Sequence, residues 1–180
     1  MGLGGGAGGG YGHECVSRYG AAMDRARWSL LLAGVGLGGF FDGIVLHQLL
    51  QWHHMVSNRV ATDTVADLET NVVGDGIFHA VTYVLTGLGV VLLWSAARRG
   101  QAPRDALTVA GLLLFGWGLF NFADSILSHY TLRLHHIRED EHEAAWDAAF
   151  LVLSLVQMAG GWWLVRSRDR LREARGNASA

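Results

Sequence analysis

The chain of 180 residues has a single cysteine, no lysine and few charged side chains. Because Cys15 has no second cysteine to pair with, a disulfide within the chain is excluded. Only 17% of the residues are charged, whereas 51% are hydrophobic. This balance argues against an ordinary soluble domain and points to a membrane protein.

Four long apolar runs indicate the fold class. Each run exceeds the roughly 20 residues that an α-helix needs to cross a bilayer at about 1.5 Å per residue. We therefore predict an all-α fold, an integral membrane four-helix bundle. Its transmembrane domain is expected at residues 25–168, with helices at about 28–54, 72–97, 106–132 and 144–165.

The charged residues predict the orientation of this bundle. All 14 basic residues are arginine, and most of them precede the first run, separate the second from the third, or follow the fourth. The other two loops are acidic. The positive-inside rule then predicts a multi-pass protein of the inner (plasma) membrane with both termini in the cytoplasm. The glycine-rich residues 1–24 are expected to be a disordered cytoplasmic tail, and residues 169–180 a second cytoplasmic tail.

The stretch "GVGLGG", residues 34–39, fits the dinucleotide-binding pattern G-x-G-x-x-G but lies inside an apolar run without a preceding strand. Small residues of this kind let membrane helices approach closely. We expect such packing at Gly34, Gly38, Gly39 and Gly43.

An internal repeat carries the unusual polar residues. "FFDGIVLHQLLQWHHM", residues 40–55, aligns without a gap with the stretch that begins "FNFADSILSHYTLRLHH" at residue 120, so that both copies read D-x4-H-x5-H-H. The following helices match more weakly, through Asp75 with Asp147 and Phe78 with Phe150, whereas His79 has Leu151 opposite it. The repeat predicts two parallel helical hairpins that present their polar groups at matching depths.

Ionisable groups inside a membrane are costly and usually functional, and imidazole is a ligand for copper, iron and zinc. We predict a polynuclear metal site near the extracytoplasmic surface. The expected ligands are His47, His53, His54, Asp75, His79, His129, His135 and His136. Residues expected to orient those ligands are Asp42, Asn71, Asn121, Asp124 and Asp147. The structural alternative is a set of hydrogen-bonded polar residues that join the helices.

On an ideal α-helix, residues seven or eleven apart return to nearly the same face. This spacing groups His47 with His54 and Asp42 with His53 in the first helix. Seven residues rise about 10.5 Å, so one metal ion cannot take all four groups from a single helix. Neighbouring helices therefore have to share the site.

The segments "FFDGIVLHQLLQWHHM", "NVVGDGIFHA" and "LFNFADSILSHYTLRLHHIRED" resemble a family of bacterial membrane proteins catalogued as domain of unknown function 2243. The resemblance spans residues 28–165 and implies a membrane location. A looser similarity relates Asp75, His79 and Asn121 to the copper-binding membrane subunit of particulate methane and ammonia monooxygenases, which implies copper held by Asp, Asn and His residues.

The leading hypothesis is a copper-dependent membrane oxidoreductase that carries out redox or oxygen chemistry, with iron as the second choice of metal. One alternative is a copper-handling transporter or assembly factor. Others are haem binding through His47 and His129, and a proton relay without metal. Expected partners are the lipid bilayer and either a homo-oligomer or a respiratory or copper enzyme, and no nucleic acid.

Overall fold

The computed structural model describes residues 9–178 and contains only helices and loops in that range. Four spans are long and apolar enough to cross a membrane, which confirms the predicted all-α membrane bundle. The elements are α1 (Gly9–Phe41), η1 (Asp42–Leu49), α2 (Val65–Arg98), α3 (Ala106–Asp124), η2 (Ser125–Thr131) and α4 (Glu143–Ala178). The η elements are π-helical continuations of the helices before them.

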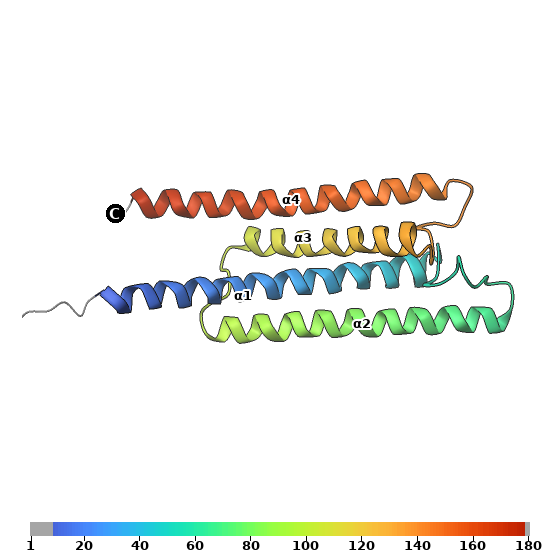
Figure 1. Cartoon of the computed structure of the whole chain (residues 1–180), viewed down its shortest axis with the longest axis horizontal. Helices are drawn as coiled ribbons and strands as arrows, with labels where there is room; N and C mark the ends of the chain where they lie inside the picture. The colour runs from blue at the N-terminus through green and yellow to red at the C-terminus, as the bar shows by residue number, and fades with distance from the viewer. Residues whose placement is uncertain (1–8, 179–180) are drawn as a thin grey trace, which may run out of the picture.

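The four long helices form two hairpins that meet at their inner helices. Helix α1 packs against α3, while α2 covers the outer side of α1 and α4 the outer side of α3 (Figure 1). The chain enters α1 and leaves α4 at the same end of the bundle (Figure 1). The η elements and the two loops that follow them lie at the other end, where the repeated polar residues gather.

Two equivalent glycines set the closest approach of the inner helices. A Cβ atom on Gly34 would meet the backbone oxygen of Leu113, and one on Gly116 would meet the backbone oxygen of Leu31. Close packing also occurs at the other predicted glycines, where Cβ atoms would collide with side chains of the neighbouring helices. Those glycines are Gly38, Gly39 and Gly43. Contact between small residues explains how a bundle with so polar an interior holds together in lipid.

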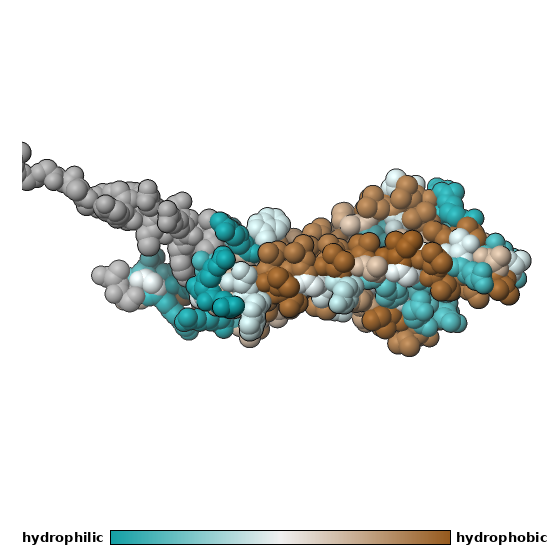
Figure 2. Space-filling view, turned by 90° about the horizontal axis from the view of Figure 1, so that it is seen from below, coloured by the Kyte–Doolittle hydropathy of each residue, from teal (hydrophilic) through white to brown (hydrophobic). Residues whose placement is uncertain are grey.

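The outer surface of the bundle is apolar where a bilayer would surround it. Figure 2 shows hydrophobic residues over the middle of one face, with hydrophilic residues toward both ends. Large apolar side chains such as Val84, Val91 and Trp163 are more than 60% exposed. Such exposure would be unfavourable in water and is favourable in hydrocarbon.

The helices are longer at the ends of the chain than the apolar runs indicated. Helix α1 reaches back to Gly9, into the segment that we expected to be disordered, and α4 continues to Ala178 through the expected second tail. The rest of the first tail, residues 1–8, lies outside the described residues. At the opposite end η1 stops at Leu49, before the first histidine pair.

Candidate metal centre

The inner helices change their winding just before the histidine pairs. In η1 and η2 the backbone forms the wider turn of a π-helix, and each element closes with an N–H···O bond of 2.8 Å, from Leu50 to Val45 and from Leu132 to Leu127. On an ideal α-helix, residues five apart would point about 140° apart. The wider turn instead places His47 Nε2 3.1 Å from Asp42 Oδ2.

A left-handed residue follows each π-helical segment. Gln51 and Arg133, which are equivalent in the two repeats, both have φ of 49°. A residue with a side chain pays on the order of 1–3 kcal/mol for such a conformation, which is typical of functional sites. The turn brings His53 back toward the bundle, where its ring centroid lies 4.4 Å from that of His47.

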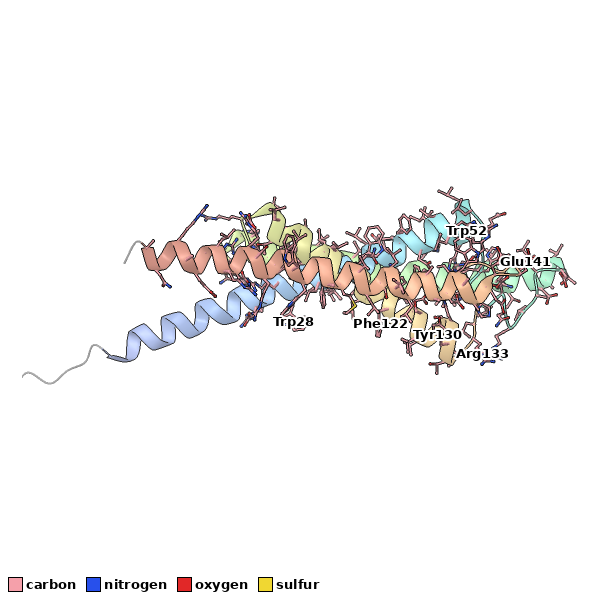
Figure 3. All side chains as sticks on the ribbon, turned by 90° about the horizontal axis from the view of Figure 1, so that it is seen from above. Trp28, Trp52, Phe122, Tyr130, Arg133 and Glu141 are labelled. Atoms are coloured by element: carbon pink, nitrogen blue, oxygen red, sulfur yellow. The ribbon has the colours of Figure 1, made fainter. Side chains whose placement is uncertain are left out.

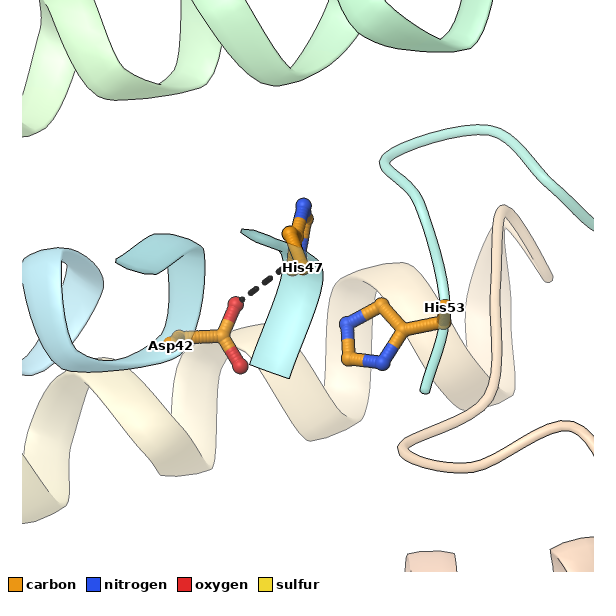
Figure 4. Close-up of side chains that lie close together, drawn as sticks. All are labelled: Asp42, His47 and His53. Carbon is orange, nitrogen blue, oxygen red and sulfur yellow. Dashed lines mark ion pairs between the residues drawn. The ribbon is translucent and has the colours of Figure 1, made fainter. Parts of the chain in front are cut away.

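The π-helical turn and the left-handed residue together bring one aspartate and two histidines close to one another in each repeat. The first half-site consists of Asp42, His47 and His53, and the second half-site of Asp124, His129 and His135. Within each half-site, one potential ligand atom per residue lies within 4.8 Å of the others. All six side chains are at most 9% exposed. Figure 4 shows the first half-site, with His47 between Asp42 and the outer helix α2.

A second aspartate orients the first histidine of each half-site. His47 Nδ1 donates to Asp75 Oδ1 at 2.8 Å, and in the second repeat His129 Nδ1 lies 2.8 Å from Asp147 Oδ1. Phe78 stacks on the His47 ring at a centroid distance of 5.4 Å. An aspartate on Nδ1 leaves Nε2 to face the centre, which is the arrangement of metal-binding histidines in many proteins.

The second histidine of each half-site is oriented by the other repeat. His53 Nδ1 donates to the backbone oxygen of Ile137 at 2.9 Å, and His135 Nδ1 donates to that of Met55 at 3.1 Å. A carbonyl oxygen can only accept, so Nδ1 carries the proton in both rings. Burial lowers the pKa of His53 well below its usual value, and the nearby His135 lowers it further. The Nε2 atom of His53 therefore presents a lone pair.

The inward-facing atoms of these side chains lack hydrogen-bond partners among the described residues. They include Nε2 of all four histidines together with one carboxylate oxygen each of Asp42 and Asp124. Nε2 of His47 and Nε2 of His129 nevertheless lie at ion-pair distance from a carboxylate oxygen of Asp42 and of Asp124, at 3.1 Å and 3.2 Å. Leaving a buried polar group unpaired costs about 1–3 kcal/mol. The three side chains of each half-site thus offer ligand atoms close enough together for one cation.

Several predicted ligands support the half-sites from outside. His54 Nδ1 donates to Asp75 Oδ2 at 2.7 Å, and His136 Nδ1 donates to Asp147 Oδ2 at 2.6 Å. His79 Nδ1 donates to the backbone oxygen of Asp75, one turn earlier in the same helix, at 2.7 Å. The structure thus places His54, His136 and His79 outside the two half-sites.

The four aspartates occupy two kinds of position around the half-sites. Asp42 and Asp124, expected to orient ligands, lie within the half-sites. Asp75, expected as a ligand, instead holds two histidine rings and the backbone N–H of Met55. Its counterpart Asp147 holds the same groups in the second repeat.

The two asparagines lie farther from the centre than the aspartates. Asn71 donates to the backbone oxygen of Val60 at 2.9 Å, which ties α2 to the loop before it. Asn121 donates to Gln157 Oε1 at 2.8 Å and links α3 to α4. Neither reaches a half-site, and Gln157 is a partner that sequence patterns did not reveal.

The fold and the site together define a multi-pass membrane protein with two repeated histidine–aspartate sets at one end of its bundle. The chain belongs to the family described as "Predicted membrane protein (DUF2243)", which matches residues 29–168. No curated protein and no solved structure matches the chain. These comparisons therefore lend no support to the looser similarity to the monooxygenase subunit.

Proposed function

We propose that the protein is a membrane metalloprotein that binds two transition-metal ions, one in each half-site. The observation that carries the proposal is the pair of buried half-sites, in each of which two histidines and one aspartate offer ligand atoms within 4.8 Å of one another. Histidines with Nδ1 held from outside are ready to bind a metal through Nε2. Two imidazoles and one carboxylate per half-site leave positions for a further ligand.

The number of buried carboxylates in and around the half-sites supports two divalent ions. Four aspartates of the two repeats, Asp42, Asp75, Asp124 and Asp147, are 1–9% exposed. Buried carboxylates require compensation by positive charge, because desolvation strongly penalises an isolated ion. Two divalent ions would neutralise four carboxylates while all of the histidines remain neutral.

Copper is the proposed metal, because four imidazoles dominate the donor set and imidazole suits copper well. Iron is the second choice, because each half-site has the two histidines and one carboxylate that are typical of non-haem iron sites. Both metals change oxidation state, so we propose an oxidoreductase that carries out redox or oxygen chemistry. The closed, buried ligand set favours this function over a copper-handling transporter or assembly factor, which would need open and labile ligands.

The packing argues against the haem alternative. The rings of His53 and His135 stack face to face, with centroids 4.4 Å apart, and contact His47 and His129 respectively. A porphyrin between His47 and His129 would need the space of those two rings. A metal-free proton relay would use the same histidine–aspartate contacts, and metal analysis separates it from the proposed function.

Elemental analysis of the detergent-purified protein tests the proposal. We expect two copper or iron ions per chain in the wild type, and almost none in a variant with both His53→Ala and His135→Ala. His142→Ala is the matched control, because its side chain is 68% exposed at the same end of the bundle. Wild-type protein without bound metal after expression in metal-supplemented medium would contradict the proposal and favour the proton relay.

We further propose that the protein lies in the inner membrane with both termini in the cytoplasm, as the distribution of arginines predicts. The two half-sites would then face the outside. Single cysteines introduced at 60–68 or 139–143, with Cys15 replaced, should be labelled from outside. Labelling only from the cytoplasm would reverse the orientation. A homo-oligomer or a respiratory or copper enzyme remains the proposed protein partner.

A further inference from the structure

An apolar pocket of about 360 Å³ lies beside the two half-sites, on the side where α1 and η1 face α4. A volume of this size is in the range of small-molecule sites. Phe41 and Leu50 at its edge are 45% and 48% exposed, so the pocket opens toward the lipid. Residues that line it include Phe41, Leu46, Trp52, Ile137, Trp146 and Phe150.

A single layer of residues separates this pocket from the histidines of the two half-sites. Phe150 stacks on the His129 ring at a centroid distance of 5.8 Å and an interplanar angle of 19°. Ile137 contributes the backbone oxygen that accepts from His53 Nδ1. A molecule in the pocket would therefore contact groups that directly touch a ligand of each half-site.

A cation lies against two tryptophans that line the pocket. The rings of Trp52 and Trp146 lie 5.8 Å apart, and the Arg138 guanidinium lies 5.3 Å from the centroid of each. Arg138 Nε binds Asp140 at 2.9 Å, and the guanidinium has further N–H groups to donate. Figure 3 shows Trp52 at the end of the bundle that carries the loops. The pocket thus has apolar aromatic walls, and a guanidinium lies next to it against the tryptophan pair.

The pocket breaks the symmetry of the two repeats. The positions equivalent to Trp52, Trp146 and Arg138 are Leu134, Gly74 and Val56. Gly74 is covered by the side chain of Met55, whose Cβ lies 3.2 Å from where a glycine Cβ would be. The half-sites themselves are closely alike, so the two repeats differ mainly in the side chains that lie between each half-site and the lipid.

We propose that this pocket binds a planar, lipophilic ring compound of the quinone class, which enters from the bilayer and lies beside the two half-sites. This inference rests on the proposed function. A ring can pack between the aromatic walls with an oxygen toward Arg138, while its apolar tail extends past Phe41 and Leu50 into the lipid. An acyl chain would fill the volume but would use neither the tryptophan pair nor the guanidinium.

The test uses metal-loaded full-length protein in lipid nanodiscs, with a decyl-substituted benzoquinone as the probe. Binding is followed as the saturable part of tryptophan fluorescence quenching, because Trp52 and Trp146 line the pocket. Ala149→Phe fills the pocket from α4, and Ala148→Phe is the matched control at an exposed neighbour that does not line it. We expect Ala149→Phe to weaken binding at least about tenfold with unchanged metal content, and Ala148→Phe to bind as the wild type does.

Two results would overturn the inference. One is equal affinity in the wild type and Ala149→Phe. The other is displacement of the quinone by a plain alkane at the same concentration, which would identify an acyl-chain groove only. A third result separates the two proposals. If the wild type contains no metal but binds the quinone saturably, and Ala149→Phe weakens that binding, the pocket is supported and the proposed metal function is overturned.

Discussion

His53 and His135 stack almost face to face, with centroids 4.4 Å apart and planes inclined by 15°. Each comes from a different repeat, and the Nδ1 atom of each is held by the backbone of the other repeat. Their Nε2 atoms are both buried and unpaired among the described residues. The stacked pair thus joins the two half-sites into one continuous centre.

Asp75→Asn should lower the metal affinity of the first half-site. An amide oxygen can accept from a histidine, but the amide NH2 group cannot, so one of the rings at His47 and His54 loses its partner. Loss of such support typically costs 10–100-fold in metal affinity. Titration against a chelator measures the change. Asp147→Asn should act equally on the second half-site, and the exposed Asp63→Asn should have no effect. If Asp75→Asn bound metal with wild-type affinity, Asp75 would not support the metal ligands.

His79→Leu should retain both metal ions. The second repeat already has Leu151 at this position, and His79 contacts the backbone of its own helix and the surface of Gly43. We expect a loss of about 1 kcal/mol in the free energy of unfolding, from one hydrogen bond. Metal content and thermal stability should be measured on the same preparation. A variant that loses one ion would restore His79 as a ligand, as the sequence alone predicted.

Gly34→Ala should weaken the contact between the two hairpins. The added methyl group meets the backbone of α3, which cannot rotate away as a side chain would. Overpacking of this kind costs typically about 1–3 kcal/mol. Gly87→Ala is the control, because no atom lies within 4 Å of its added Cβ. Unfolding in mixed detergent measures both variants, and equal stability would show that α1 and α3 can separate freely at Gly34.

Asp105→Asn should remove a contribution to stability that depends on pH. The Arg168 guanidinium and the Thr108 hydroxyl lower the pKa of the Asp105 carboxyl to about 2, whereas an aspartate in the unfolded chain has a pKa of about 3.9. The contribution is therefore present above about pH 4 and is lost as the pH falls toward 2. Asparagine still caps α3, so the melting temperatures should differ at pH 7 and converge near pH 2. A difference that persists at pH 2 would point to a lost cap instead.

The sequence alone predicted the four membrane helices, and its repeat contains the six residues that the structure brings together in the two half-sites. Apolar length and the matched positions of Asp42 and Asp124 were sufficient for this. The contact between Asp42 and His47 was not predictable, because residues five apart point in different directions on a regular α-helix. The π-helical turn, and the left-handed conformation of Gln51 and Arg133, have no clear signature in the sequence. For this reason the sequence predicted Asp75 as a ligand and Asp42 as an orienting residue, whereas the structure places Asp42 inside the half-site and Asp75 outside it.

The crossed bonds from His53 to Ile137 and from His135 to Met55 have a consequence for the origin of the chain. A single hairpin contains an aspartate and two histidines, yet it lacks the carbonyl group that would orient its own second ring. Such a hairpin would complete its site only beside a second copy of itself. The present chain has the organisation of a homodimer joined into one polypeptide, in which the two halves can differ on their lipid-facing sides.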